Sequence, residues 1–140
     1  MIRKAPFEDL KIWQESHRLM LICHKIANTL PKDEFERKSQ IKRSSSSVCD
    51  NIAEGYTSYY YNDKLKGFYT ARKEAGETQN HLKSLSSKKL ITTDLADRLV
   101  SDYQGLIIGI NKFAKYIIGK RDREKTKGIV PKFPKYPKSP

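Results

Sequence analysis

The chain has 140 residues, of which 37% are hydrophobic and 31% are charged, and its formal net charge at pH 7 is +12. This length suits one domain with a single core. No segment approaches the ~20 apolar residues of a membrane span, and the N-terminus lacks the apolar stretch of a secretory signal. We therefore expect a cytoplasmic protein with no membrane partner. Two cysteines, Cys23 and Cys49, fit buried thiols better than a disulfide framework or a zinc site.

The first predicted helix covers about residues 9–30, where apolar residues recur at steps of three and four in two neighbouring rows. A face this wide can line the core of its own bundle and leave an edge for a neighbouring subunit. The rows are Leu10, Trp13, His17, Met20, Ala27 and Leu30, and Ile12, Leu19, Ile22 and Ile26.

The second predicted helix covers about residues 33–54, after Pro31 interrupts the pattern. Gly55 would end it, because glycine suits the left-handed turn that closes many helices. The run Ser44 to Ser47 lies inside the apolar period. We interpret these serines as small residues that allow a neighbouring helix to approach closely.

The third and fourth predicted helices cover about residues 63–89 and 93–118. Asn62 or Asp63 would cap the third, and Thr92 or Thr93 the fourth, which would end near Gly119. The fourth helix repeats the wide apolar face of the first. Four amphipathic segments with short connections predict an all-α, up-down-up-down antiparallel four-helix bundle over residues 1–119.

Residues 120–140 form a predicted basic tail that holds half of the net positive charge. Pro131, Pro134, Pro137 and Pro140 recur at the three-residue period of polyproline II. This period places the lysines on one edge of the tail, and Phe133 and Tyr136 on another. A solvated tail without a partner and a binding strip are both compatible with this pattern.

Three blocks of sequence resemble the signature of the family named for proteins encoded in 23S rRNA intervening sequences. They are Phe7 to Gln14, the segment Gln40 to Gly55 that ends in Asn-Ile-Ala-Glu-Gly, and Ala71 to Thr78. The resemblance covers about residues 7–118. It departs from the common pattern in its serine run, where the family more often has alanine, and at Lys73 and Glu74, where many members have Gly-Ser.

The resemblance implies a homopentameric barrel of four-helix bundles. It also implies a fold similar to that of the accessory variability determinant proteins of diversity-generating retroelements, which bind RNA and a reverse transcriptase. The partners expected from it are further copies of this chain, RNA or DNA and, in a retroelement setting, a reverse transcriptase. Fold alone does not establish these partners.

Polar residues of the matching blocks have spacings that allow several to point inward. Buried polar groups need hydrogen-bond partners, so we favour a network that fixes the helix register over a direct ligand role. The signature residues are Trp13, Gln40, Arg43, Asn51, Glu54, Gly55, Glu74 and Glu77.

The sequence favours a protein that is not an enzyme and that needs no cofactor or metal. A carboxylate-bridged metal pair needs Glu-x-x-His motifs, whereas Glu77 and His81 are four residues apart. There is no glycine-rich phosphate loop and no nucleophile elbow. Excess positive charge instead favours polyanions as partners.

We therefore predict a homo-oligomer that binds nucleic acid, RNA more than DNA, through phosphate contacts. One alternative is a scaffold whose ring or proline-rich tail docks a protein partner, and a lysine-bearing helix face can also be only a solvated surface. The candidate nucleic-acid-binding residues are Lys64, Lys66, Lys73, Lys83, Lys88, Lys89, Lys120, Arg121, Arg123, Lys125, Lys127, Lys132, Lys135 and Lys138.

Overall fold

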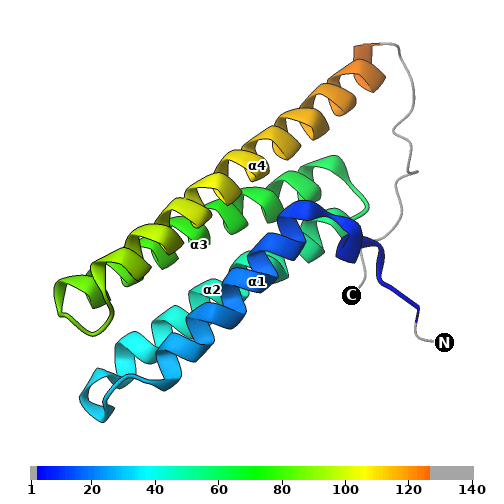
Figure 1. Cartoon of the computed structure of the whole chain (residues 1–140). Coiled ribbons are helices and arrows are strands. Elements are labelled where there is room, and N and C mark those ends of the chain that lie inside the picture. Colours follow the sequence, from blue (N-terminus) through cyan, green and yellow to red (C-terminus); the bar gives the residue numbers. More distant parts are fainter. Residues whose placement is uncertain (1–2, 127–140) are drawn as a thin grey trace.

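The computed structural model describes residues 3–126, and this range contains four α-helices, two short 3-10 helices and no strand. Neighbouring helices run in opposite directions, and α4 extends beyond the ends of the other three (Figure 1). The prediction of an all-α four-helix fold is confirmed. None of the described helices is long and apolar enough to cross a membrane. The elements are η1 Pro6–Asp9, α1 Lys11–Asn28, η2 Lys32–Glu34, α2 Phe35–Thr57, α3 Tyr61–Ser87 and α4 Thr93–Thr126.

The core lies between the four helices and is formed mainly by aliphatic side chains. Tyr103 of α4 is its largest fully buried residue, and its hydroxyl lies 3.6 Å from the Cys23 sulfur. Cys23 and Cys49 are both buried and free, as predicted. Burial raises the pKa of each thiol to about 11, so both are protonated at neutral pH.

The serine run of α2 lies against both neighbouring helices. Ser44 and Ser45 are fully buried, and the Ser44 hydroxyl lies 2.8 Å from that of Thr78 in α3. On the other side, Ser46 lies 2.9 Å from Nε2 of His24 in α1. The serines are therefore small enough for close packing and also supply polar contacts between helices.

Gly55 does not end α2, which continues to Thr57. It is buried, and a Cβ atom added there would lie 2.9 Å from the Lys64 carbonyl oxygen of α3. Facing it, a Cβ atom on Gly67 would lie 2.7 Å from the Gly55 Cα. The glycine of the signature therefore serves a backbone contact between two helices, and the predicted left-handed turn is wrong.

The cap predicted for α3 is also wrong, because this helix begins at Tyr61 and its N-cap, Tyr60, makes no side-chain capping bond. Asn62 instead accepts a hydrogen bond from Arg121 of α4. The cap of α4 is confirmed, since the Thr92 hydroxyl accepts the backbone N–H of Leu95 at 3.2 Å.

The predicted end of α4 near Gly119 is wrong, and the first part of the predicted tail is helical up to Thr126. Glycine within a helix costs only about 1 kcal/mol, which tertiary contacts can offset. Two such contacts join this segment to the start of α3: Tyr61 donates to Glu124 at 2.8 Å, and Arg121 donates to Asn62 at 2.9 Å. The remaining tail, residues 127–140, lies outside the described residues.

Candidate nucleic-acid interface

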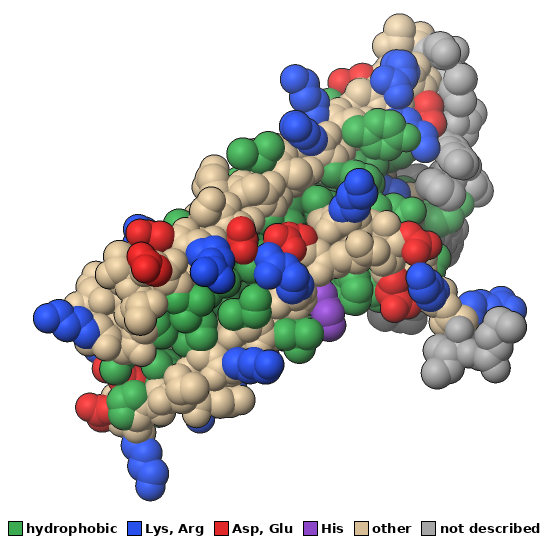
Figure 2. Space-filling view, in the orientation of Figure 1, with side chains coloured by type: hydrophobic (Ala, Val, Ile, Leu, Met, Phe, Trp, Pro, Cys, Tyr) green, Lys and Arg blue, Asp and Glu red, His purple; other side chains and the backbone are tan. Residues whose placement is uncertain are grey.

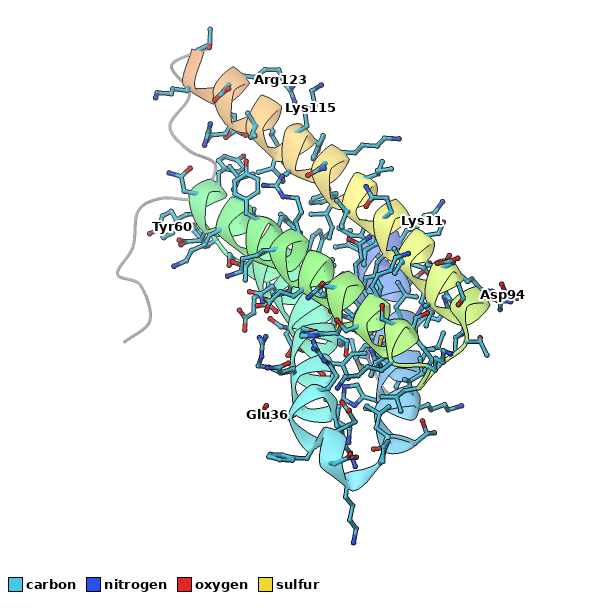
Figure 3. All side chains as sticks on the ribbon, turned by 90° about the vertical axis from the view of Figure 1, so that its left-hand side faces the viewer. Lys11, Glu36, Tyr60, Asp94, Lys115 and Arg123 are labelled. Atoms are coloured by element: carbon cyan, nitrogen blue, oxygen red, sulfur yellow. The ribbon has the colours of Figure 1, made fainter. Side chains whose placement is uncertain are left out.

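A groove of about 540 Å³ lies between α3 and α4. The two helices are farther apart at the end that holds Tyr60 and Arg123 than at the end that holds Asp94 (Figure 3). Residues at steps of three and four along α3 share the face that lines this groove. We call it the α3–α4 groove, and its lining residues are Asn62, Leu65, Lys66, Tyr69, Thr70, Lys73, Ile118 and Arg121.

The described lining of the α3–α4 groove carries three positive charges and no carboxylate. Lys66 and Lys73 are exposed and lie two helical turns apart on α3, a separation of about 10 Å. Arg121 faces them from α4, and two residues each accept one of its hydrogen bonds: Asn62 of α3 and its own neighbour Asp122. A guanidinium has five N–H donors, so Arg121 keeps donors for an anion.

Tyr69 adds an exposed aromatic ring to this groove, and the Arg72 guanidinium lies 4.9 Å from the centre of the ring. Arg72 also donates a 2.8 Å hydrogen bond to Asn111 of α4. Prediction from charge alone omits Tyr69 and Asn62. The steps of four, three and four from Asn62 through Lys66 and Tyr69 to Lys73 place these residues on one helical face, and this signal is present in the sequence.

Other predicted nucleic-acid-binding residues lie elsewhere. Lys64 and Lys120 line a neighbouring pocket beneath the overhanging end of α4. At the opposite end of the bundle, Lys83 pairs with Asp97 at 3.2 Å and Lys88 pairs with Glu34 at 2.8 Å. Lys89 lies in the turn after α3, with a φ angle of 61°. Lys83, Lys88 and Lys89 therefore do not join the α3–α4 groove.

The final turns of α4 contain Arg123 and Lys125, which are exposed. Figure 2 shows Lys and Arg side chains gathered over the C-terminal half of α4, with hydrophobic side chains exposed beneath it. The candidate residues Lys127, Lys132, Lys135 and Lys138 lie outside the described residues.

Only some of the polar signature residues point into the core. Arg43 of α2 bridges two carboxylates of α3, with distances of 3.2 Å to both Glu74 and Glu77. Of these three side chains only Glu74 is buried. Its burial and the neighbouring Glu77 carboxylate raise the pKa of Glu74, while Arg43 acts in the opposite direction. This cluster joins α2 to α3 at the edge of the core.

The remaining signature residues make local contacts or face outward. Trp13 stacks on His17 with 4.7 Å between ring centres, and Phe7 packs against it at 5.2 Å. Asn51 donates to the Ser47 carbonyl and hydroxyl oxygens within α2. Gln40 and Glu54 are exposed.

Within residues 3–126, no group of three or more His, Cys, Asp and Glu side chains is placed to hold a metal ion. His81 is buried near Glu77, but its Nδ1 atom accepts a 2.7 Å hydrogen bond from Arg37. Nδ1 is therefore engaged, whereas the other ring nitrogen, Nε2, is buried without a hydrogen-bond partner among the described residues.

The fold and this surface define a class: a small helical bundle with a basic groove between two of its helices. A family model described as 23S rRNA-intervening sequence protein matches residues 8–112. The chain therefore belongs to the 23S rRNA-intervening sequence protein family, and the membership predicted from the three sequence blocks is confirmed.

Among the solved structures with the same fold is a protein of unknown function from the S23 ribosomal protein family of Bacteroides thetaiotaomicron, determined at 1.70 Å resolution. It superposes with a TM-score of 0.70 at 24% sequence identity, and the match covers 74% of this chain and 98% of that one. None of the curated proteins compared with this chain matches it. The expected likeness to retroelement accessory proteins stays a prediction.

Proposed function

We propose that this protein is a non-enzymatic homo-oligomer that binds nucleic acid through phosphate contacts in the α3–α4 groove. The observation that supports this best is the presence of Lys66, Lys73 and Arg121 in one groove whose described lining contains no carboxylate. Lys66 and Lys73 form no ion pair within residues 3–126, and Arg121, which pairs with Asp122 at 3.2 Å, keeps further donors. Cations in a groove attract polyanions and release their counterions on binding. We propose RNA over DNA because the family takes its name from an rRNA intervening sequence.

Oligomerisation would repeat the groove around an assembly and multiply its phosphate contacts. Each subunit offers large apolar side chains to solvent: Leu21 is 50% exposed and Ile108 is 49% exposed. We propose that these residues lie at or near contacts between copies, and that the assembly is the homopentamer expected for this family. We also propose a reverse transcriptase as a further partner of this assembly.

The test replaces the three cations of the groove together, as K66Q/K73Q/R121Q. Binding of a fluorescent single-stranded RNA is measured by anisotropy between 50 and 200 mM salt. Each lost phosphate contact reduces the slope of log K against log salt by about 0.7 for a single strand. We therefore expect the slope to fall by about 2 for each set of three contacts that is lost.

The matched control is K83Q/K88Q/K89Q, which removes the same charge at the opposite end of the bundle, where two of the lysines are already ion-paired. We expect this variant to bind nearly as the wild type does. Equal weakening by both variants would show that net charge acts without a defined groove, which contradicts the proposal.

The alternative function is a scaffold whose ring or proline-rich tail docks a protein. Deleting residues 127–140 removes the proline repeat and leaves α4 complete. RNA retention after this deletion, with loss of a co-purifying protein, would favour the scaffold role for the tail. Loss of RNA would assign the tail lysines to nucleic-acid binding.

A further inference from the structure

A second cavity, of about 450 Å³, lies where the overhanging end of α4 meets the end of α2 and the start of α3. This volume is within the range of small-molecule sites, about 300–1,000 Å³. Its walls combine aromatic rings with two ammonium groups, and we call it the aromatic–lysine pocket. The residues used below are Tyr56, Phe68, Phe113, Tyr116, Lys64 and Lys120.

The aromatic rings form a connected cluster. Phe113 lies 5.0 Å from Phe68, 6.3 Å from Tyr56 and 6.0 Å from Tyr116, measured between ring centres. Phe68 is fully buried and fixes the inner side of the cluster, whereas Tyr116 is 55% exposed. The outer ring can therefore offer a face to a planar ligand without a change in the core.

Lys64 is held near the rings, and Lys120 lines the same pocket. Lys64 donates a 2.8 Å hydrogen bond to the Tyr56 carbonyl oxygen, and its Nζ atom lies 5.8 Å from the centre of the Tyr56 ring. Burial and the charge of Lys120 lower the pKa of Lys64. Neither lysine forms an ion pair with a carboxylate of residues 3–126. An anion between the two ammonium groups would relieve their mutual repulsion.

The pocket and the α3–α4 groove lie on two sides of the same helix contact. Lys64 and Lys120 line the pocket, while their chain neighbours Leu65 and Arg121 line the groove. Successive helical residues point about 100° apart, so one pair of helices presents both surfaces. A polyanion held in the groove is therefore near the pocket.

We propose that the aromatic–lysine pocket binds one unpaired nucleotide of a single-stranded nucleic acid, with the base on Tyr116 and Phe113 and the phosphate between Lys64 and Lys120. This inference rests on the proposed nucleic-acid binding and extends it to the strandedness of the ligand. Stacking of a base on an aromatic ring tolerates any base sequence. A base within a duplex would first have to be flipped out, at a cost of a few kcal/mol.

The tail of this chain, residues 127–140, is the alternative occupant of the pocket, and its charge argues against it. The tail carries Phe133 and Tyr136, but Lys132, Lys135 and Lys138 alternate with them. A basic segment adds positive charge to a pocket that already holds two lysines, whereas a nucleotide adds the opposite charge. A nucleotide therefore complements both the rings and the ammonium groups.

The experiment compares a single-stranded RNA with a duplex of the same length, both binding to the full chain at one salt concentration. Tyr116→Leu removes an exposed ring and keeps an apolar side chain. We expect it to weaken single-strand binding by about 5-fold to 150-fold, the effect of losing one stacked base, and to leave duplex binding unchanged. Lys120→Gln should weaken the single strand more than the duplex.

Phe35→Leu is the matched control, because Phe35 is 68% exposed at the start of α2, away from the pocket. We expect it to bind both ligands as the wild type does. The inference is overturned if Tyr116→Leu affects both ligands equally, or if its effect disappears in the chain lacking residues 127–140, which would make the tail the occupant.

Failure of this inference is separable from failure of the proposed function. If the wild-type protein binds neither ligand, both proposals fall. If it binds both ligands through Lys66, Lys73 and Arg121 while Tyr116→Leu has no effect, only the pocket assignment falls. Unchanged thermal melting of each variant, followed by circular dichroism, shows that a binding defect is not unfolding.

Discussion

At the scale of single residues, the small side chains of the family signature are explained by the contact between α2 and α3. Gly55 and Gly67 bring the two backbones together, and Ser44 meets Thr78 across the same interface. A larger side chain at either glycine meets backbone atoms, which cannot move aside as the end of a flexible side chain can. Positions 55 and 67 therefore tolerate only small residues, because backbone atoms of the other helix lie directly opposite them.

Gly67→Ala should destabilise the protein by about 1–3 kcal/mol, the usual cost of overpacking. The added Cβ would lie 2.9 Å from the Asn51 carbonyl oxygen as well as 2.7 Å from the Gly55 Cα. Gly76→Ala in the same helix is the control, because nothing lies within 4 Å of its Cβ position. It should stabilise by about 0.5–1 kcal/mol. Urea unfolding measures both, and equal effects would contradict the contact.

A pH dependence is expected from His81. Its burial, together with Arg37 and Arg43, lowers the pKa of His81 below 6.5, although Glu77 opposes this shift. Below pH 6.5 the unfolded chain then binds the proton more readily than the folded protein does. The contribution of neutral His81 to stability is therefore complete above pH 6.5 and is lost as pH falls through the folded pKa.

The measurement is the free energy of unfolding in urea at pH 7.5, 6.5 and 5.5 for the wild type and His81→Gln, at one protein concentration. Glutamine can still accept from Arg37 but does not titrate. The stability advantage of the wild type should shrink toward acid pH, by at most about 1.4 kcal/mol per pH unit. A difference that is independent of pH would exclude His81 as the titrating group.

At the scale of elements, the long α4 helix decides where the two candidate sites lie. Its last turns pass beyond the bundle, and their contacts are concentrated on the start of α3 through Tyr61 and Asn62. Burial and the Glu124 carboxylate raise the pKa of Tyr61 to about 12, so its hydroxyl stays a donor at neutral pH. This bond holds one wall of the aromatic–lysine pocket in place.

Tyr61→Phe should loosen the end of α4. Glu124 would lose its donor at Oε1, and its other oxygen is buried without a partner among the described residues. An unpaired buried group costs about 1–3 kcal/mol, so amide hydrogen exchange over residues 118–126 should become at least about 5-fold faster. Asp122→Asn, which alters an exposed ion pair with Arg121, should leave these rates nearly unchanged.

At the scale of the whole molecule, positive charge and exposed apolar side chains lie on the surface together. Leu21 and Ile108 belong to different helices, and each is about half exposed. Much of the wide apolar face predicted for α1 and α4 is used within the single chain, because Ile12, Ile22 and Ile107 pack against the core. Only the residues left outside that packing are available to a second copy.

The double variant L21K/I108K should reduce the oligomeric mass if these side chains lie between copies, because a lysine in an apolar contact must be desolvated. Size-exclusion chromatography with light scattering measures the mass. Thr57→Lys adds charge at an exposed position at the end of α2 and should leave the assembly intact. An unchanged mass in the double variant would place the contacts elsewhere, and a monomeric wild type would contradict the oligomer itself.

The sequence alone determined that there are four helices, that both thiols are buried, that Thr92 or Thr93 caps the fourth helix, and which family the chain belongs to, because each of these depends on local periodicity, local hydrogen bonding or a continuous motif. The tertiary structure alone decided that α2 passes through Gly55 and that α4 passes through Gly119, since packing against α3 outweighs the weak local preference of glycine. It also decided that Lys66 and Lys73 share a groove with Arg121 while Lys83 and Lys88 are paired with carboxylates. The positions of charged residues in the sequence do not indicate how far two helices diverge. That divergence determines which cations line the same groove.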